Sequence, residues 1–229
     1  MSLIEMHDVT KIYPLGHQQV TAVDDLTLTI GQGEFTVLAG PSGSGKTTVL
    51  NLIGCLDQPS TGSIVVDGRD VGASSVKALA DFRLRKIGFI FQSYNLIPVL
   101  TAEENAEFTL MLRGVAKEER RLRVRALFAE LGIDGLEGRR PNDLSGGQQQ
   151  RVAVARAMAA EPAVILADEP TANLDSKSAE ELLALMRRLN EEKGTTFVIS
   201  SHDTLVISHA RRVVRLRDGR LEADEKLEQ

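Results

Sequence analysis

The stretch Leu38-Ala39-Gly40-Pro41-Ser42-Gly43-Ser44-Gly45-Lys46-Thr47-Thr48-Val49-Leu50 decides the fold of this chain. It contains the pattern G-x-x-x-x-G-K-[ST], which is typical of a phosphate-binding loop when it joins a strand to a helix. An apolar run at 35–39 precedes it and a helix-like run at 48–55 follows it. The pattern arises by chance in on the order of one chain in a hundred, which disfavours a plain flexible glycine turn.

Each part of this loop has a chemical task. Glycines let the backbone turn tightly enough to direct several N–H groups at one anion, and the dipole of the following helix adds positive potential. Lys46 can reach the outer phosphates, and the Thr47 hydroxyl is placed to ligate Mg²⁺. We therefore predict a nucleoside-triphosphate site with Mg²⁺, formed by Gly40, Pro41, Ser42, Gly43, Ser44, Gly45, Lys46, Thr47 and Thr48.

Composition narrows the class of protein. The chain has 229 residues, with 27 basic and 32 acidic side chains and a net charge of −5. This length suits one α/β domain with an inserted subdomain, and the charge does not favour nucleic acid or an anionic membrane surface. Cys55 is the single cysteine, so no disulfide framework is expected, and its apolar neighbours predict a buried thiol. With no signal-peptide pattern and no apolar run of membrane-spanning length, we expect a cytosolic protein.

Polar residues follow three further apolar runs that we interpret as buried strands. The runs span 87–91, 163–167 and 195–200. Ligands of open α/β sheets gather at the carboxyl ends of strands. Gln92 is therefore a candidate for the Mg²⁺ shell or the attacking water, with a solvated strand end as an equal alternative. Asp168 is placed to hold Mg²⁺ through water, and Glu169 to deprotonate the attacking water. His202 could donate to a γ-phosphate, although a lone histidine is more often structural.

A second anion site is predicted at Leu144-Ser145-Gly146-Gly147-Gln148. Ser145 is a natural N-cap for a helix expected over 149–160, and Gly146 and Gly147 leave its first amides unhindered. One nucleotide does not need two such cradles.

Tyr13 gives a weaker signal. Residues 10–16 are expected to leave the first strand, at 3–9, through a turn, and two short strands are expected at 20–23 and 26–30. The Tyr13 ring in this region could stack on a base, but packing is the commoner role of an aromatic residue at a strand end.

Two other segments leave alternatives open. The loop 93–101 is too apolar for an ordinary exposed loop, so it either contacts a partner or covers the core; its apolar residues are Leu96, Ile97, Val99 and Leu100. A helix expected at 117–131 is basic, but interleaved glutamates make a solvated face the better interpretation than nucleic-acid binding. The charged tail, 222–229, is expected to fray.

Taken together, these motifs resemble, in order, those of the ATP-binding cassette (ABC) ATPases over essentially the whole chain. The resemblance makes Tyr13 the A-loop aromatic, Gln92 the Q-loop glutamine and His202 the H-loop histidine. Residues 144–148, 164–169 and 173–175 are similar to the signature, the Walker B motif and the D-loop. The segments 89–98 and 145–153 look most like the lipoprotein-release, macrolide-export and cell-division branch. Ala172 departs mildly from that branch, which usually has glycine there.

The resemblance implies a fold and a set of roles. The fold is an α/β P-loop NTPase core with a mostly parallel sheet, an antiparallel β subdomain and an α-helical signature subdomain. One domain would cover 1–229, with a helical insertion at about 92–148 between core segments at about 1–91 and 149–229. Glu169, His202 and Gln92 would be catalytic, and Thr47, Gln92 and Asp168 would hold Mg²⁺. Tyr13, the phosphate loop and Ser145, Gly146, Gly147 and Gln148 would bind ATP.

The resemblance also implies partners. Two copies would close head to tail on two ATP molecules, each between one phosphate loop and the other copy's signature. Integral membrane permease subunits would supply the membrane span, so the chain would lie on the inner face of the cell membrane. ATP hydrolysis would drive transport or mechanical work, and no nucleic acid is expected. Two alternatives are an ATPase of nucleic-acid repair or chromosome maintenance, disfavoured by the short separation of the halves, and a non-hydrolysing switch, disfavoured by Glu169.

Overall fold

The computed structural model describes residues 1–16 and 18–227, and its central element is a six-stranded sheet in the order β10-β9-β3-β8-β7-β6. The neighbours from β9 to β6 are parallel, and β10 is antiparallel at one edge. The strands are β3 (Phe35–Ala39), β6 (Ile87–Ile90), β7 (Val164–Asp168), β8 (Thr196–Ser201), β9 (Arg212–Arg217) and β10 (Arg220–Lys226). Because β3, β6, β7 and β8 run in the same direction, the residues that follow them meet at one edge of the sheet.

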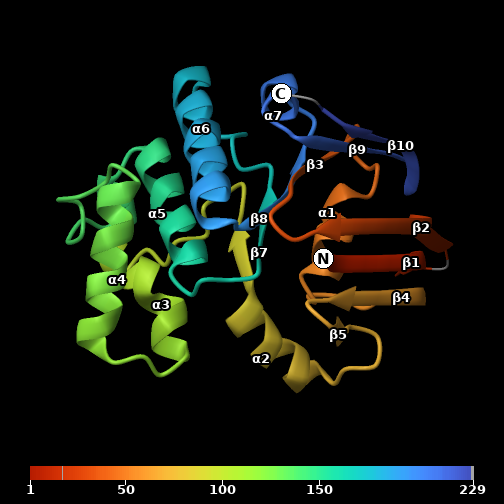
Figure 1. The fold of residues 1–229 in the computed structure, drawn as a ribbon, viewed down its shortest axis with the longest axis horizontal. Helices are drawn as coiled ribbons and strands as arrows, with labels where there is room; N and C mark the ends of the chain where they lie inside the picture. The colour runs from red at the N-terminus through yellow and green to blue at the C-terminus, as the bar shows by residue number, and fades with distance from the viewer. Residues whose placement is uncertain (17, 228–229) are drawn as a thin grey trace.

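A second, antiparallel sheet has the order β2-β1-β4-β5. Its strands are β1 (Ser2–Leu15), β2 (Gln18–Gly31), β4 (Thr61–Val66) and β5 (Arg69–Asp70). In Figure 1 these N-terminal strands lie on the right, away from the helices α3, α4 and α5. The mostly parallel sheet, the antiparallel sheet and the group of helices confirm the predicted fold class.

The helices complete the layers. They are α1 (Lys46–Ile53), α2 (Val76–Lys86), α3 (Ala102–Leu112), α4 (Lys117–Glu130), α5 (Gly146–Met158), α6 (Ser176–Lys193) and α7 (Thr204–Ser208), with a 3-10 turn at Pro141–Asp143. Helix α5 begins at Gly146, earlier than the expected start at 149, because Ser145 already accepts a hydrogen bond as its N-cap. Helices α3, α4 and α5 pack together on the left of Figure 1.

Two apolar clusters cover the two faces of the parallel sheet. One joins the antiparallel sheet, α1 and one face of β3 through side chains such as Met6, Leu26 and Leu52, all fully buried. The other packs α5 and α6 on the opposite face around Phe35 and Phe197. Cys55 belongs to the first cluster, where burial raises the pKa of its thiol to about 11, so the predicted buried thiol is confirmed. Helix α1, which directly follows the phosphate loop, therefore packs into the first cluster.

Three local expectations were wrong. Strand β1 continues to Leu15 instead of turning at residue 10, because residues 11–15 pair with 18–23 of β2. The two short strands expected at 20–23 and 26–30 are one strand, with an irregular register where Asp25 is left-handed at φ 52°. The tail does not fray over Arg220–Lys226, which pair with β9 as β10; residues 228–229 lie outside the described part.

Within residues 1–16 and 18–227, no helix is both long enough and apolar enough to cross a bilayer.

Candidate functional site

The phosphate loop curls between β3 and α1 in a shape that its glycines permit. Gly45 has φ 99°, and a Cβ atom there would lie 2.4 Å from the carbonyl oxygen of Ala22. Lys46 is buried and donates to the carbonyl oxygens of Gly40 at 2.7 Å and Pro41 at 2.9 Å. The buried Ser44 hydroxyl has no hydrogen-bond partner among the described residues. A curved loop with an unused donor and a cation fits the oxygens of a triphosphate.

Thr47 meets Asp168 beside this loop. Its hydroxyl lies 3.2 Å from each carboxylate oxygen of Asp168, at the end of β7. The Ser200 hydroxyl, at the end of β8, donates to the same carboxylate. Hydroxyl and carboxylate oxygens are ligands that Mg²⁺ accepts while keeping waters and phosphate oxygens in its remaining positions. No cluster of three or more histidine, cysteine or acidic ligands occurs in the described part of the chain.

Glu169 is fixed by the end of β8. Its Oε1 lies 2.8 Å from Nδ1 of His202, and its Oε2 accepts from the Ser201 hydroxyl at 2.9 Å. Its backbone is left-handed at φ 45°, a conformation that non-glycine residues rarely adopt outside functional sites and turns. Pro170 follows Glu169, and its carbonyl oxygen accepts a hydrogen bond at 2.6 Å from the fully buried side chain of Gln150 in α5.

The other predicted residues complete the wall of one cavity of about 590 Å³. The side chain of Gln92 is exposed, and the Asn173 amide donates to its main-chain oxygen at 2.9 Å. Tyr13 is half-buried, and its hydroxyl donates to Asp57 at 2.8 Å. The cavity is lined by Tyr13, Ser42, Gly43, Ser44, Gly45, Lys46, Thr47, Thr48, Gln92, Glu169 and His202, among others.

The signature residues stand apart from this cavity. Ser145 caps α5, because its hydroxyl accepts from the Gln148 amide at 3.3 Å and the Gln148 side chain accepts from the Ser145 amide at 2.9 Å. A Cβ atom on Gly146 would lie 2.8 Å from the Tyr94 hydroxyl. None of residues 145–148 is among the lining residues of the cavity. In a single copy, the second predicted anion site therefore lies outside this cavity.

Sequence reasoning missed several contacting residues. Ser200 and Ser201 hold the two acidic residues, and Asp57 holds Tyr13. The two serines could have been found from the sequence, since they immediately precede His202 at the same strand end. Asp57 and Gln150 had none, because a polar residue outside a phosphate-loop pattern could equally face solvent.

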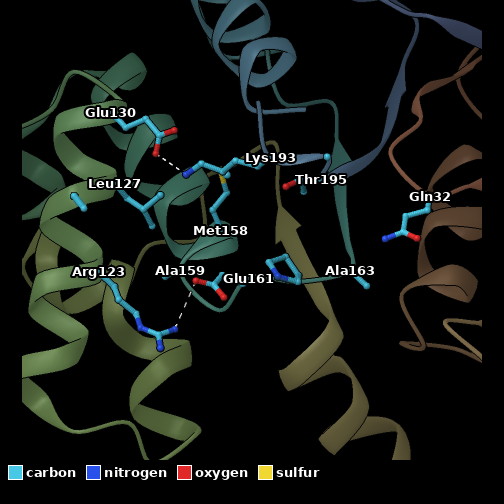
Figure 2. A pocket seen from close by; sticks show the side chains of 13 residues that line it. Gln32, Arg123, Leu127, Glu130, Met158, Ala159, Glu161, Ala163, Lys193 and Thr195 are labelled. Atoms are coloured by element: carbon cyan, nitrogen blue, oxygen red, sulfur yellow. Dashed lines mark hydrogen bonds and ion pairs between the residues drawn. The ribbon is translucent and has the colours of Figure 1, made fainter. Parts of the chain in front are cut away.

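A second hollow, of about 620 Å³, lies near the opposite edge of the sheet, where Ala163 and Thr195 immediately precede β7 and β8 (Figure 2). Figure 2 shows Lys193 paired with Glu130, at 2.6 Å, and Arg123 paired with Glu161, at 3.8 Å. None of the predicted site residues lines it. Its charged side chains therefore pair with one another.

The phosphate loop, the acidic strand end and the parallel sheet define a P-loop nucleoside triphosphatase. The sequence profile of the ABC transporter family matches residues 23–172. An uncharacterized ABC transporter ATP-binding protein of Thermotoga maritima is 47% identical over 98% of this chain and 95% of its own length. The macrolide export ATP-binding/permease protein MacB 1/2 of Paracoccus denitrificans is 47% identical over 98% of this chain but only 33% of that protein.

Solved structures agree with these relatives. The dimeric structure of the bacterial ABC transporter cassette MJ0796 is similar to this chain with a TM-score of 0.91 and 44% identity, covering 99% of each chain. A post-hydrolysis dimer of MJ0796 bound to ADP and Pi has a TM-score of 0.91 and 43% identity, again covering 99% of each chain. The chain belongs to the ABC transporter family, as its ATP-binding ATPase component. The predicted family is confirmed, with MacB proteins among its relatives.

Proposed function

We propose that this chain hydrolyses ATP with Mg²⁺ in the cavity between Tyr13 and His202, and that a second copy completes the site. The observation that carries this proposal is the gathering of the phosphate loop, Gln92, Glu169 and His202 around one cavity while Ser145 stands outside it. The phosphate-loop amides and Lys46 would bind the phosphates. The Tyr13 ring would stack on the base.

The residues around the γ-phosphate would divide the chemistry. Glu169 would orient the attacking water and accept its proton, since its carboxylate lines the cavity together with the phosphate loop. Thr47 and Asp168 would hold Mg²⁺, which when bound neutralises charge that develops on the phosphates. Gln92, which lies just after the end of β6, would contact the metal or the water. The Thr47 hydroxyl lies 3.2 Å from the Asp168 carboxylate, which supports a metal ion held by both residues.

His202 would stabilise charge on the γ-phosphate. Its Nδ1 lies 2.8 Å from Glu169, so a proton on Nδ1 is donated to that carboxylate. Donation to a phosphate would come from the other ring nitrogen, Nε2. His202 would therefore contact both the catalytic base, Glu169, and the γ-phosphate.

The signature would act on the nucleotide of the other copy. Ser145 and the first amides of α5 would bind an anion, and they do not line the chain's own cavity. The similar MJ0796 cassette is described as dimeric, which supports a dimer here.

Mixing two inactive variants tests this shared site. Glu169→Gln lacks the base but keeps its signature, and Ser145→Arg lacks the signature but keeps its base. A mixed dimer contains one site with an intact base and an intact signature, so mixing the purified variants should restore ATP hydrolysis well above that of either alone. A mixture no more active than its components would contradict the shared site. The control is a mixture of each variant with the wild-type chain, which shows how much activity changes when active chains are only diluted by an inactive one.

We further propose that a membrane permease docks beside Gln92, so that the chain works on the cytoplasmic face of the membrane. The named fusion of ATP-binding and permease parts in the MacB relatives supports such a partner, and favours transport over a nucleic-acid ATPase. A groove of about 370 Å³ next to the loop at 93–101 is lined by Leu56, Leu84, Phe89 and Phe91. The Phe89 and Phe91 rings stack at 5.7 Å, which offers an apolar seat for a permease segment.

The apolar loop that follows Gln92 is divided between the core and the surface. Leu96 packs against the core, whereas Val99 is 73% exposed. Leu56→Arg should reduce recovery of the chain with its co-expressed permease, because it places a charge in the groove from a side chain that is 49% exposed. Leu122→Arg, at a 72% exposed leucine of α4 outside the groove, is the matched control. Equal recovery of both variants would reject docking in this groove.

A further inference from the structure

Tyr13 is held at the rim of the nucleotide cavity by a side chain from a distant part of the sequence. Its hydroxyl donates to Oδ2 of Asp57 at 2.8 Å. Asp57 follows the C-terminal end of α1, whereas Tyr13 lies near the end of β1. A tyrosine ring on a strand can otherwise change rotamer, so this hydrogen bond fixes where the ring lies.

Asp57 is itself firmly held. Its Oδ1 accepts from Nζ of Lys11 at 2.5 Å and from the amide of Gln58 at 2.7 Å. The Lys11 ammonium also donates to the Gln58 carbonyl at 2.8 Å and lies 4.9 Å from the centre of the Tyr13 ring. The Lys11 side chain is only 13% exposed and that of Asp57 is 30% exposed. One cation therefore holds the carboxylate and lies against the aromatic ring.

The charges agree with this arrangement. Burial raises the pKa of Asp57, but the hydrogen bonds from Lys11, Tyr13 and the Gln58 amide, together with the charge of Lys11, leave the pKa below its ordinary value, so Asp57 is a carboxylate acceptor. Burial, and then the hydrogen bond to Asp57, raise the pKa of Tyr13, so the phenol keeps the proton that it donates.

Helix α1 connects this contact to the phosphate loop. Lys46 and Thr47 form its first turn, and Asp57 follows its last turn by a few residues. Movement of α1 would therefore carry the phosphate loop and the anchor of the aromatic ring together. The groups that contact the phosphates and the base of one nucleotide would then both be positioned by α1.

We propose that Asp57, held by Lys11, is a positioning residue that sets the Tyr13 ring for stacking on the purine base of the bound nucleoside triphosphate. This inference rests on the proposed role of Tyr13. It assigns to Asp57 an effect on base recognition and none on phosphate binding.

Calorimetry with two ligands tests this distinction. Asp57→Ala should weaken binding of ATP with Mg²⁺ by roughly threefold to tenfold, a part of the loss expected when base stacking is removed. The same variant should bind inorganic triphosphate with Mg²⁺ as the wild type does, because that ligand has no base. Asp57→Asn, whose amide oxygen can still accept from the phenol, should retain more of the ATP affinity. Equal loss for both ligands would overturn the proposal.

A matched control and a double variant exclude an indirect effect. Asp67→Asn removes a similarly exposed carboxylate, paired with Lys86 at 2.8 Å outside the cavity, and should leave both affinities unchanged. Tyr13→Phe removes the hydroxyl, so adding Asp57→Ala to it should weaken ATP binding no further. A full additional loss in the double variant would show that Asp57 does not act through Tyr13.

Tyr13→Ala separates this inference from the function on which it rests. If Tyr13→Ala leaves ATP affinity unchanged, the stacking role of Tyr13 is wrong. If it weakens ATP binding while Asp57→Ala does not, only the positioning role is wrong. The chain has two tyrosines and no tryptophan, so phenol absorbance in a Tyr94→Phe background reports Tyr13 alone. Asp57→Ala should lower the pKa of Tyr13 there, and an unchanged pKa would contradict the hydrogen bond in solution.

Discussion

Glu169 has a backbone conformation and a set of contacts that suit a fixed base. Its amide donates to the Ser200 carbonyl at 3.0 Å, while Ser201 and His202 hold its two carboxylate oxygens. The left-handed backbone at φ 45° turns the chain sharply after β7. Strain of this kind persists where the surroundings determine the conformation, as they do here through β8.

His202 is the residue whose removal should affect the rate most selectively. His202→Ala should lower kcat by about 10²–10³, the loss for one electrostatic donor, with little change in ATP affinity. Steady-state turnover at saturating ATP and equilibrium nucleotide binding measure the two quantities. His209→Ala is the matched control, because His209 also lies near a glutamate, 3.4 Å from Glu180, but outside the cavity. Near-normal turnover of the His202 variant would remove His202 from the catalytic group.

The residues of the site differ in how far their positions could be predicted. Lys46, Asp168 and Glu169 were identified because their chemistry requires a given residue type beside a strand end. Ser201 and Asp57 were not, because a serine or an aspartate serves equally well on a solvated surface. Their contacts depend on which segments fold next to each other, and a single sequence does not show that.

At the scale of elements, β10 shows why strand pairing was harder to predict than the motifs. Its sequence is highly charged, which is typical of a mobile tail. Arg212 of β9 nevertheless binds Asp224 through two hydrogen bonds, at 2.8 and 2.7 Å, and also donates to Glu34 at 2.8 Å. The ion pairs belong to neighbouring strands, so no pattern within one segment indicates them.

The Arg212–Asp224 pair should make stability depend on pH. Asp224 has a pKa below its ordinary value, chiefly because of the hydrogen bond from Arg212, so it stabilises the fold above the ordinary pKa. Asp224→Asn should lower the free energy of unfolding by about 1–2 kcal/mol at neutral pH, between exposed and buried pairs. The difference from the wild type should shrink as the pH falls through the lowered pKa of Asp224. Denaturant titrations at several pH values test this, and a pH-independent difference would contradict it.

Helix α5 connects the signature to the base through Gln150. Gln150→Leu removes the donor to the Pro170 carbonyl, directly after Glu169, and should lower kcat by up to about 10²-fold through misplacement of the base. Asn190→Leu is the control: Asn190 is also buried, and its Oδ1, like the Oε1 of Gln150, lacks a partner in the described residues. Both variants should lose stability by about 1–3 kcal/mol, but only Gln150→Leu should lose turnover. Equal turnover of the two would contradict the link.

At the scale of the whole molecule, the fold separates the two helix termini that the sequence predicts to bind anions. The N-terminus of α1 opens into the cavity with Glu169, and the N-terminus of α5 does not. The sequence predicted both termini and their redundancy within one chain. The distance between them in the fold could not be predicted, because it depends on how α3, α4 and α5 pack beside the sheet.

We propose that a second copy completes each nucleotide site, and the molar mass of the Glu169→Gln variant in solution tests this most directly. This variant keeps the phosphate loop and Asp168, so ATP should bind without being hydrolysed. Light scattering after size-exclusion chromatography should give a dimer with ATP and Mg²⁺ and a monomer with ADP. Adding Ser145→Arg should return the ATP-bound variant to a monomer. A monomer of the Glu169→Gln chain at saturating ATP and Mg²⁺ would contradict the shared site.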